Sequence, residues 1–202
     1  VLCLNYMGTF YLLVDSMEQA KSCLEKAYFI SDSLHEMNVK LLVLDKLIEV
    51  EEQLEPYKAL RYAKDLVKMY DSMANVTIYN KVAARLRLGE NFFYVDSLQH
   101  ALEEERKAYR MAMKAGDSNL LSYVRQNLAS TFEEMGEKDS CLYYARLAYD
   151  LNAANRFSCL LTFASAYISV DSLNQAFSLL KQAMPKRQKT AILCFIFKVK
   201  QL

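Results

Sequence analysis

Residues 88–108, LGENFFYVDSLQHALEEERKA, contain a spacing of small and large side chains that recurs along the chain. A large apolar residue precedes a small one at Leu88-Gly89, an aromatic residue follows at Phe92, and small residues return at Ala101 and Ala108. Five segments share these offsets, and the residues in the Gly89 position are Gly8, Leu47, Gly89, Ala129 and Ala164. Self-similarity at steps of 39, 42, 40 and 35 residues indicates a solenoid of stacked helical repeats.

Composition favours helices over strands. The 202 residues include only four Gly and two Pro, which is too few for the many turns of an all-β fold. We therefore predict an all-α, right-handed superhelical solenoid of antiparallel helix pairs, with about eleven helices. Their expected ranges are 2–14, 16–30, 33–53, 56–70, 73–94, 97–114, 118–135, 140–152, 156–169, 172–183 and 187–202.

A second pattern predicts where the helices begin. Asp and Ser are strong N-caps, because their side-chain oxygens accept the free N–H groups of a first turn. The dipeptide Asp-Ser occurs seven times, at Asp15, Asp32, Asp71, Asp96, Asp117, Asp139 and Asp171. Proline suits the first helical turn and supplies two further starts, at Pro56 and Pro185.

These offsets resemble the tetratricopeptide repeat (TPR), whose signature is W-x2-L-G-x2-Y…A-x3-F…A…P. The first repeat matches it at Leu4, Met7, Gly8, Tyr11, Ala20, Leu24 and Ala27. The second is the weakest, with Lys46 where a large apolar residue is usual and Leu47 where a small one is usual. The resemblance covers the whole chain as one repeat domain, with repeats at about 1–31, 32–70, 71–114, 115–152 and 153–184 and a partial sixth at 185–202.

The resemblance implies a non-catalytic module that binds a peptide or partner domain in a concave groove, within a regulatory or scaffolding protein. The long repeats and frequent Asp-Ser junctions also resemble bacterial regulators, in which such an array precedes a membrane helix and a signalling segment. A ligand- or peptide-sensing array of that kind is therefore the first alternative. RNA binding by helical repeats is the second.

Charge and hydropathy narrow the partners. The net charge is +1, which gives no case for nucleic acid, and no run reaches the roughly 18 apolar residues of a membrane helix. The five cysteines form no CxxC pair, and Cys141 and Cys159 should open neighbouring antiparallel helices at opposite ends. We expect free thiols and a soluble segment, cytoplasmic or periplasmic. Because the chain starts with Val1 and stops within a helical pattern, we also expect a fragment of a longer protein.

No residue pattern points to catalysis. His35 and His100 are isolated, and no HExxH, Cys/His metal spacing or Gly-rich phosphate loop occurs. The run 103–107, EEERK, has the spacing of a solvent-exposed face with paired charges. We predict no catalytic residues, no metal site and no cofactor.

In the TPR family the first helix of each repeat lines the concave surface. Carrying those offsets onto this chain predicts an acidic and aromatic groove centre, formed by Glu51, Glu52, Glu90, Phe93, Tyr94, Tyr123, Glu133 and Glu134. Such a groove should prefer basic and hydrophobic peptides. At the other end, Phe195 and Phe197 lie on a first helix without a second. They predict an interface there, with the rest of the protein or with a second copy in a homodimer.

Overall fold

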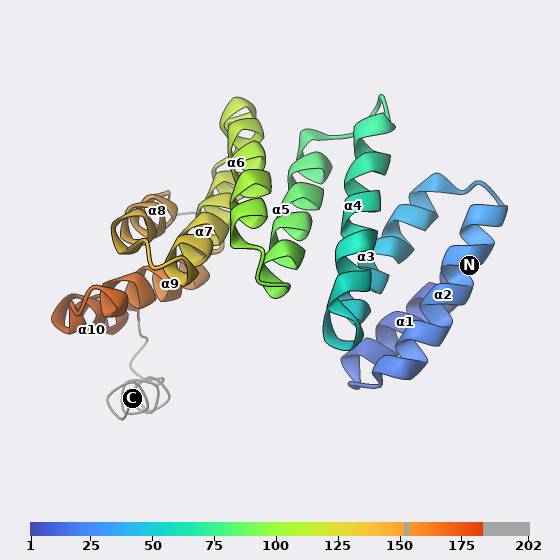
Figure 1. The fold of residues 1–202 in the computed structure, drawn as a ribbon, viewed down its shortest axis with the longest axis horizontal. Coiled ribbons are helices and arrows are strands. Elements are labelled where there is room, and N and C mark those ends of the chain that lie inside the picture. The colour runs from blue at the N-terminus through green and yellow to red at the C-terminus, as the bar shows by residue number, and fades with distance from the viewer. Residues whose placement is uncertain (152–153, 184–202) are drawn as a thin grey trace. The chain divides into compact units, whose positions relative to one another are not determined.

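The computed structural model describes residues 1–151 and 154–183, which fold into ten helices and no strands (Figure 1). The chain divides into two compact units, an N-terminal unit of Val1–Leu120 and a C-terminal unit of Leu121–Leu202. The helices are α1 (Leu2–Leu13), α2 (Met17–Ser33), α3 (Met37–Leu54), α4 (Pro56–Ser72), α5 (Ile78–Tyr94), α6 (Leu98–Ala115), α7 (Ser118–Glu134), α8 (Lys138–Asp150), α9 (Arg156–Ser169) and α10 (Leu173–Ala183). The eleventh predicted helix lies outside the described residues.

Each unit is built from helix hairpins. We call the first helix of a hairpin the A helix (α1, α3, α5, α7 and α9) and the second the B helix. In the N-terminal unit every helix from α1 to α6 packs on the next one along the chain, as Figure 1 shows. In the C-terminal unit α8 packs on α9 and α9 on α10. Consecutive packing of this kind is typical of a solenoid, in which each repeat contacts only its neighbours.

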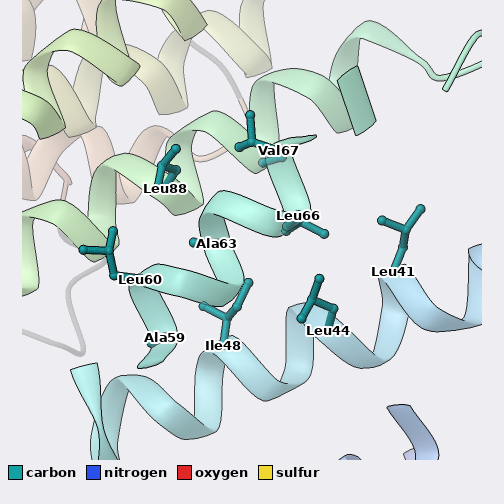
Figure 2. Packing of buried hydrophobic residues seen from close by; sticks show 10 residues of the cluster. Leu41, Leu44, Ile48, Ala59, Leu60, Ala63, Leu66, Val67 and Leu88 are labelled. Carbon is teal, nitrogen blue, oxygen red and sulfur yellow. The ribbon is translucent and has the colours of Figure 1, made fainter. Parts of the chain in front are cut away.

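In the core of the N-terminal unit, α3 packs against other helices with two of its faces. Val43, Leu47 and Val50 are fully buried in a cluster with Ala20, Leu24 and Ala27 of α2. Leu41, Leu44 and Ile48 belong instead to a cluster with α4, where Figure 2 shows Ile48 next to Ala59 and Ala63. The predicted register of the second repeat is therefore wrong by one residue, because Ile48 and not Leu47 faces the B helix of its own repeat.

The contact between A and B helices explains the small residues. A Cβ added to Gly8 would lie 2.5 Å from Cγ of Leu24, and one added to Gly89 would lie 3.1 Å from Cγ of Glu105. In the second repeat the sizes are exchanged, with large Ile48 beside small Ala63. Close packing holds the summed volume at this crossing nearly constant, and so the offset tolerates different residues.

The Asp-Ser dipeptides occupy four different positions relative to the helices, and only some of them begin helices as predicted. Asp15, Asp96 and Asp171 adopt left-handed backbone conformations with φ of 56°, 58° and 57°, just after an A helix. The N–H of the following serine bonds back five residues to the A helix, as at Ser16 to Tyr11 (2.8 Å). This is the Schellman ending of a helix, and aspartate is tolerated there because its short polar side chain suits the left-handed region.

Of the four remaining dipeptides, the one at Asp117 caps a helix as predicted. Asp117 accepts a hydrogen bond on Oδ1 from the N–H of Leu120 (2.9 Å), so it caps α7. Asp32 and Asp71 lie inside the last turns of α2 and α4, and Asp139 lies in the first turn of α8. As a result α3 begins at Met37 instead of 33 and α5 at Ile78 instead of 73.

Two further corrections concern α6 and the turn before α3. Glu104 and Glu105 are buried, so the 103–107 run is not a solvent-exposed face throughout. Glu104 accepts from Arg85 of α5 (2.9 Å) and from Lys107 (2.5 Å). His35 is not at a helix start but at the left-handed residue between α2 and α3, with φ of 54°.

Candidate functional site

The predicted groove residues of α3 point in two directions. Glu51 is fully buried and forms ion pairs with Lys58 of α4 (2.6 Å) and Lys21 of α2 (3.2 Å). It therefore faces the B helices and is not available to a partner, which corrects its assignment to the groove. The one-residue register error is the reason, since it moved a buried position onto the predicted surface.

The lysines around Glu51 are held by further carboxylates. Lys21 also pairs with Glu55 (2.9 Å) and Lys58 with Glu25 (3.0 Å). Burial opposes the charge of Lys58, but its hydrogen bonds to Glu51 and Glu25 outweigh that and raise its pKa. Lys21 has a raised pKa mainly because of its hydrogen bond to Glu55. We call these five side chains (Lys21, Glu25, Glu51, Glu55 and Lys58) the ionic cluster.

Glu52 lies on the other side of α3 and meets α5. Its Oε1 accepts from Nδ2 of Asn91 (2.8 Å) and lies 3.5 Å from Nη1 of Arg87. Arg87 also approaches Asp45 (3.5 Å) and Glu90 (3.8 Å). The structure thus brings Glu52 and Glu90 together around one arginine, between neighbouring A helices. We call Asp45, Glu52, Arg87, Glu90 and Asn91 the acidic seam.

Desolvation changes the acidity of this seam. Burial raises the pKa of Glu52, with Arg87 and Asn91 acting in the opposite direction and Glu90 adding to the increase. Burial also raises the pKa of Tyr94, and the negative charges of Glu52 and Glu90 raise it further. Tyr94 is an exposed aromatic residue, and it lies about one helical turn after Glu90 on α5.

The other predicted aromatic residue of the N-terminal unit is only partly exposed. Phe93 packs edge-on against Tyr94, with ring centroids 6.2 Å apart. Tyr94 with Glu90 and the edge of Phe93 consequently forms the accessible border of the seam.

In the C-terminal unit the predicted residues Tyr123, Glu133 and Glu134 all lie on α7. Tyr123 and Glu134 are exposed, whereas Glu133 is partly buried and accepts a hydrogen bond from Ser165 of α9 (2.8 Å). The structure places them in a different compact unit from the acidic seam, so the two sets are described separately.

Between α7 and α9 lies a polar contact that was not predicted from the sequence. Ser122 donates to Asn155 (2.6 Å) and lies 3.0 Å from Sγ of Cys159, and Ser158 donates to Gln126 (2.7 Å). Gln126 in turn donates to Sγ of Cys159 (3.1 Å). We call these five residues the neutral seam. Ser122 and Gln126, four residues apart on one side of α7, were a signal in the sequence for a polar contact, but their spacing does not identify the partners.

The buried thiols are protected from ionisation. Burial raises the pKa of Cys141 to about 12, with a smaller contribution from the charge of Glu133. Burial also raises the pKa of Cys159, against hydrogen bonds from Ser122 and Gln126. Cys3, Cys23, Cys141 and Cys159 are all free thiols, as expected, and Cys194 lies outside the described residues.

A basic hollow on the surface of the N-terminal unit was also not predicted. Its volume is about 560 Å³, and Arg85, Lys107, Arg110 and Lys114 line it together with Tyr109 and two methionines. Arg85 is neutralised by Asp71 (2.6 Å) and by Glu104 (2.9 Å). Lys107 also pairs with Glu104. Two of the four basic residues of the hollow are thus already paired with carboxylates of the protein.

Residues 1–151 and 154–183 contain no cluster of three or more His, Cys, Asp or Glu side chains placed to hold a metal ion. Within the same residues no helix has the length and apolarity that crossing a membrane requires. Phe195 and Phe197, and with them the interface and homodimer predicted at the C-terminal end, lie outside the described residues.

Comparisons with known proteins agree with this architecture. No family model matches the sequence, and no curated protein matches it. Among solved structures, TPR-like repeats of a putative kinesin light chain from Podospora anserina are 14% identical with a TM-score of 0.75, and the match covers 89% of this chain and 91% of that one.

Two regulatory proteins are also similar in structure. One is a signal transduction ATPase with numerous domains (STAND) and a tetratricopeptide repeat sensor, from Pyrococcus horikoshii, at 16% identity and a TM-score of 0.76 over 93% of this chain and 30% of that one. The other is the Rap conjugation gene regulator of plasmid pLS20 in complex with the Phr* peptide, at 16% identity and a TM-score of 0.72. This match covers 88% of this chain and 50% of that one. The fold is therefore that of TPR-like helical repeats, as the sequence pattern predicted.

Proposed function

We propose that the chain is a non-catalytic protein-interaction module, and that the acidic seam of the N-terminal unit binds basic segments of a partner. The observation that carries this proposal is the gathering of Glu52 and Glu90 around Arg87, beside exposed Tyr94. The seam needs no induced assembly, since hydrogen bonds and ion pairs within the protein already hold its side chains. A preorganised site loses less conformational entropy on binding.

The charge balance of the seam favours a cationic ligand. Three carboxylates (Asp45, Glu52 and Glu90) surround one guanidinium, which leaves a net negative charge. Burial of Glu52 makes that charge costly to leave without further compensation. A lysine or arginine from a peptide would supply this compensation, and it could also rest on the ring of Tyr94.

The structural neighbours support a peptide as the ligand class. The similar Rap regulator was solved in complex with the Phr* peptide, and the similar STAND protein carries its repeats as a sensor. By analogy this array would act within a regulatory protein. A sensing array of a membrane-linked bacterial regulator remains the alternative, in which ligand binding at the seam is passed along the stacked helices.

Tyr123 and Glu134 provide a second exposed acidic and aromatic surface on α7, with Glu133 partly buried beside it. We include these three residues in the proposal as a separate contact of the C-terminal unit. Their test is independent of the first, because the residues belong to another compact unit.

A peptide titration tests the seam. Fluorescence anisotropy should show tighter binding of a basic, leucine-containing peptide than of the same peptide with its Lys and Arg replaced by Glu. Glu90→Lys should weaken binding by about tenfold, since it reverses a charge that faces the ligand. The control is Glu103→Lys, which makes the same charge change at an exposed position of α6.

Equal effects of the two variants would show that only net charge matters, and preferential binding of the acidic peptide would overturn the proposal. Tyr94→Ala adds a charge-free check. If Tyr94 contacts the ligand, its removal should weaken binding while the dependence on salt stays the same.

A further inference from the structure

The basic hollow of the N-terminal unit has no part in the proposed function. Four cationic side chains line it, Arg85 from α5 and Lys107, Arg110 and Lys114 from the C-terminal half of α6. The two helices pack on each other, as Figure 1 shows. Four cations around one hollow are a strong local concentration of charge in a chain whose net charge is only +1.

Two of these cations are neutralised within the protein and two are not. Arg85 pairs with two carboxylates, and Lys107 shares one of them. Arg110 and Lys114 are exposed, and neither forms an ion pair with any residue that the structure describes. Four cations therefore face two carboxylates, which leaves the hollow with an excess of two positive charges.

This excess distinguishes α6 from three other B helices. Residues 106–115, RKAYRMAMKA, contain four basic side chains and no acidic one. The stretches at the same offsets in the repeats of α2, α4 and α8 (25–34, 64–73 and 146–155) each contain both signs of charge. Arg110 and Lys114 are also four residues apart, and like charges at this spacing repel each other on one helix face. An anion between them would relieve this repulsion.

Neighbouring repeats leave these two positions open. The residues at equivalent offsets are all exposed, although each of their repeats is followed by another one. They are Phe29, Lys68 and Asp150 for Arg110, and Ser33, Ser72 and Ala154 for Lys114. The exposure of the two cations is thus a property of the repeat and does not come from a chain end.

We propose that the basic hollow binds an extended acidic segment of a partner protein, and that Arg110 and Lys114 pair with two negative charges of this segment. Charge complementarity supports the proposal, because two adjacent carboxylates or one phosphate dianion would balance the excess. The planar guanidinium of Arg110 suits the paired oxygens of either group. Met113, which also lines the hollow and is 50% exposed, offers an apolar contact to the residues beside the charges.

The form of the hollow favours a protein segment over a small molecule or a nucleic acid. Six of the seven lining residues lie on α6, so only Arg85 provides an opposite wall. Pockets for small molecules enclose most of the ligand surface, whereas a segment laid along one helix needs no such enclosure. Two free cations are also few for a nucleic acid, whose affinity depends on many phosphate contacts.

Peptide titrations of the 202-residue chain, followed by fluorescence anisotropy, test the proposal. The first peptide carries two adjacent glutamates between leucines, the second a single phosphoserine there, and the third two glutamines. The first two distinguish carboxylate from phosphate as the source of the charge, and the third removes the charge alone. At least one charged peptide should bind saturably and at least tenfold more tightly than the glutamine peptide.

Two variants of α6 locate the binding. Arg110→Gln should weaken binding of the charged peptide about tenfold. The matched control is Arg106→Gln, which removes the same charge from an exposed position about one turn earlier, outside the hollow, and should change binding less than twofold. Thermal unfolding verifies that both variants are folded. If Arg110 only stabilised the C-terminal end of α6 through the helix dipole, its loss would lower the melting temperature and leave the affinity unchanged.

Four outcomes would overturn the proposal. They are equal binding of charged and uncharged peptides, equal effects of Arg110→Gln and Arg106→Gln, tighter binding of single-stranded RNA than of either charged peptide, and a peptide-free dimer that Arg110→Gln dissociates. The last would assign the hollow to a second copy. A basic peptide at the acidic seam should respond to Glu90→Lys and not to Arg110→Gln, so failure at the hollow is distinguishable from failure of the proposed function.

Discussion

The two compact units join their A helices with different chemistry. In the N-terminal unit Glu52 of α3 meets Arg87 and Asn91 of α5, and the ionic cluster joins α3 to its two flanking B helices. In the C-terminal unit the contacts between α7 and α9 that carry the neutral seam are made by hydroxyl, amide and thiol groups. The same kind of repeat can therefore be held together by charges or by neutral hydrogen bonds.

This difference separates two levels of information in a repeat. Offsets of small and large residues specify where helices cross, because close packing leaves little freedom in volume. Polar residues between the crossings determine how strongly the stability of the contact depends on salt and on the loss of one partner. An ion pair depends on both partners and on salt, whereas a neutral hydrogen bond contributes about 1 kcal/mol with little dependence on salt.

The largest expected effect comes from leaving Glu51 without its lysines. In the double variant Lys21→Met/Lys58→Met a fully buried carboxylate keeps no cation, and removing the partners of a buried charge costs about 3–5 kcal/mol. Urea denaturation followed by circular dichroism measures this loss. The counterpart in the other unit, Ser165→Ala, should cost about 1 kcal/mol or less, since Glu133 is only partly buried.

A third variant distinguishes charge from packing. Adding Glu51→Leu to the double variant removes the unpaired charge and should restore most of the lost stability, because apolar replacement of a whole buried ion pair is often neutral. Failure of Glu51→Leu to restore stability would show that the lysine stems, and not their charges, hold α2, α3 and α4 together.

The next effect tests the crossings themselves and should be the same in both units. Ala101 is fully buried in α6 and Ala176 nearly so in α10, at equivalent offsets. Leucine at either site overpacks the crossing and should cost about 1–3 kcal/mol in urea denaturation. A cost in one unit and none in the other would mean that the offsets do not describe the same crossing in both.

The sequence predicted the helix crossings better than the polar contacts between them. The ten described helices were predicted within a few residues, because crossings require small residues at regular intervals. The register was wrong in α3, since this helix runs to Leu54 and connects through Glu55 to Pro56 without the left-handed turn used after α1 and α5. That connection shifts the register by one residue, so Glu51 was assigned to the surface although it is buried.

The candidate site was less predictable for a physical reason. Adjacent residues of a helix point about 100° apart, so a one-residue error moves a side chain to another face. Glu90 and Tyr94 lie on α5, where the predicted offsets match the structure, and their role in a groove stays a prediction. The neutral seam could not be read in advance, since each of its serines has many possible partners in the sequence and the correct one depends on tertiary contacts.

A smaller effect is expected at the turns after the A helices. Gly136 and Asp96 occupy equivalent left-handed positions in the two units, with φ of 76° and 58°. Gly136→Ala should destabilise by about 1 kcal/mol, because an alanine Cβ crowds the backbone in this region. Asp96→Gly should stabilise by a few tenths of a kcal/mol, since relief of strain slightly exceeds the entropy that glycine loses on folding. Thermal unfolding of both variants measures the difference, and a loss at Asp96→Gly would mean that the carboxylate stabilises the turn.

The smallest expected effect is a loss of stability in high salt, and it should differ between the acidic seam and the neutral seam. At about 1 M salt the screening length falls to about 3 Å, so partly exposed pairs such as Arg87–Asp45 and Arg85–Asp71 are weakened. Hydrogen exchange followed by mass spectrometry should then show amides of α3 and α5 exchanging about twofold faster than at low salt, a change of roughly 0.4 kcal/mol. Amides of α9 near Ser158 and Cys159 provide the internal control, because Ser122, Gln126 and Cys159 carry no charge to screen, whereas Ser165 further along α9 donates to the charged Glu133. Salt also strengthens apolar burial, and this contribution acts on all helices alike. The difference between α5 and α9 therefore isolates the electrostatic part, and equal responses of the two helices would show that the charges of the acidic seam do not contribute to holding the A helices together.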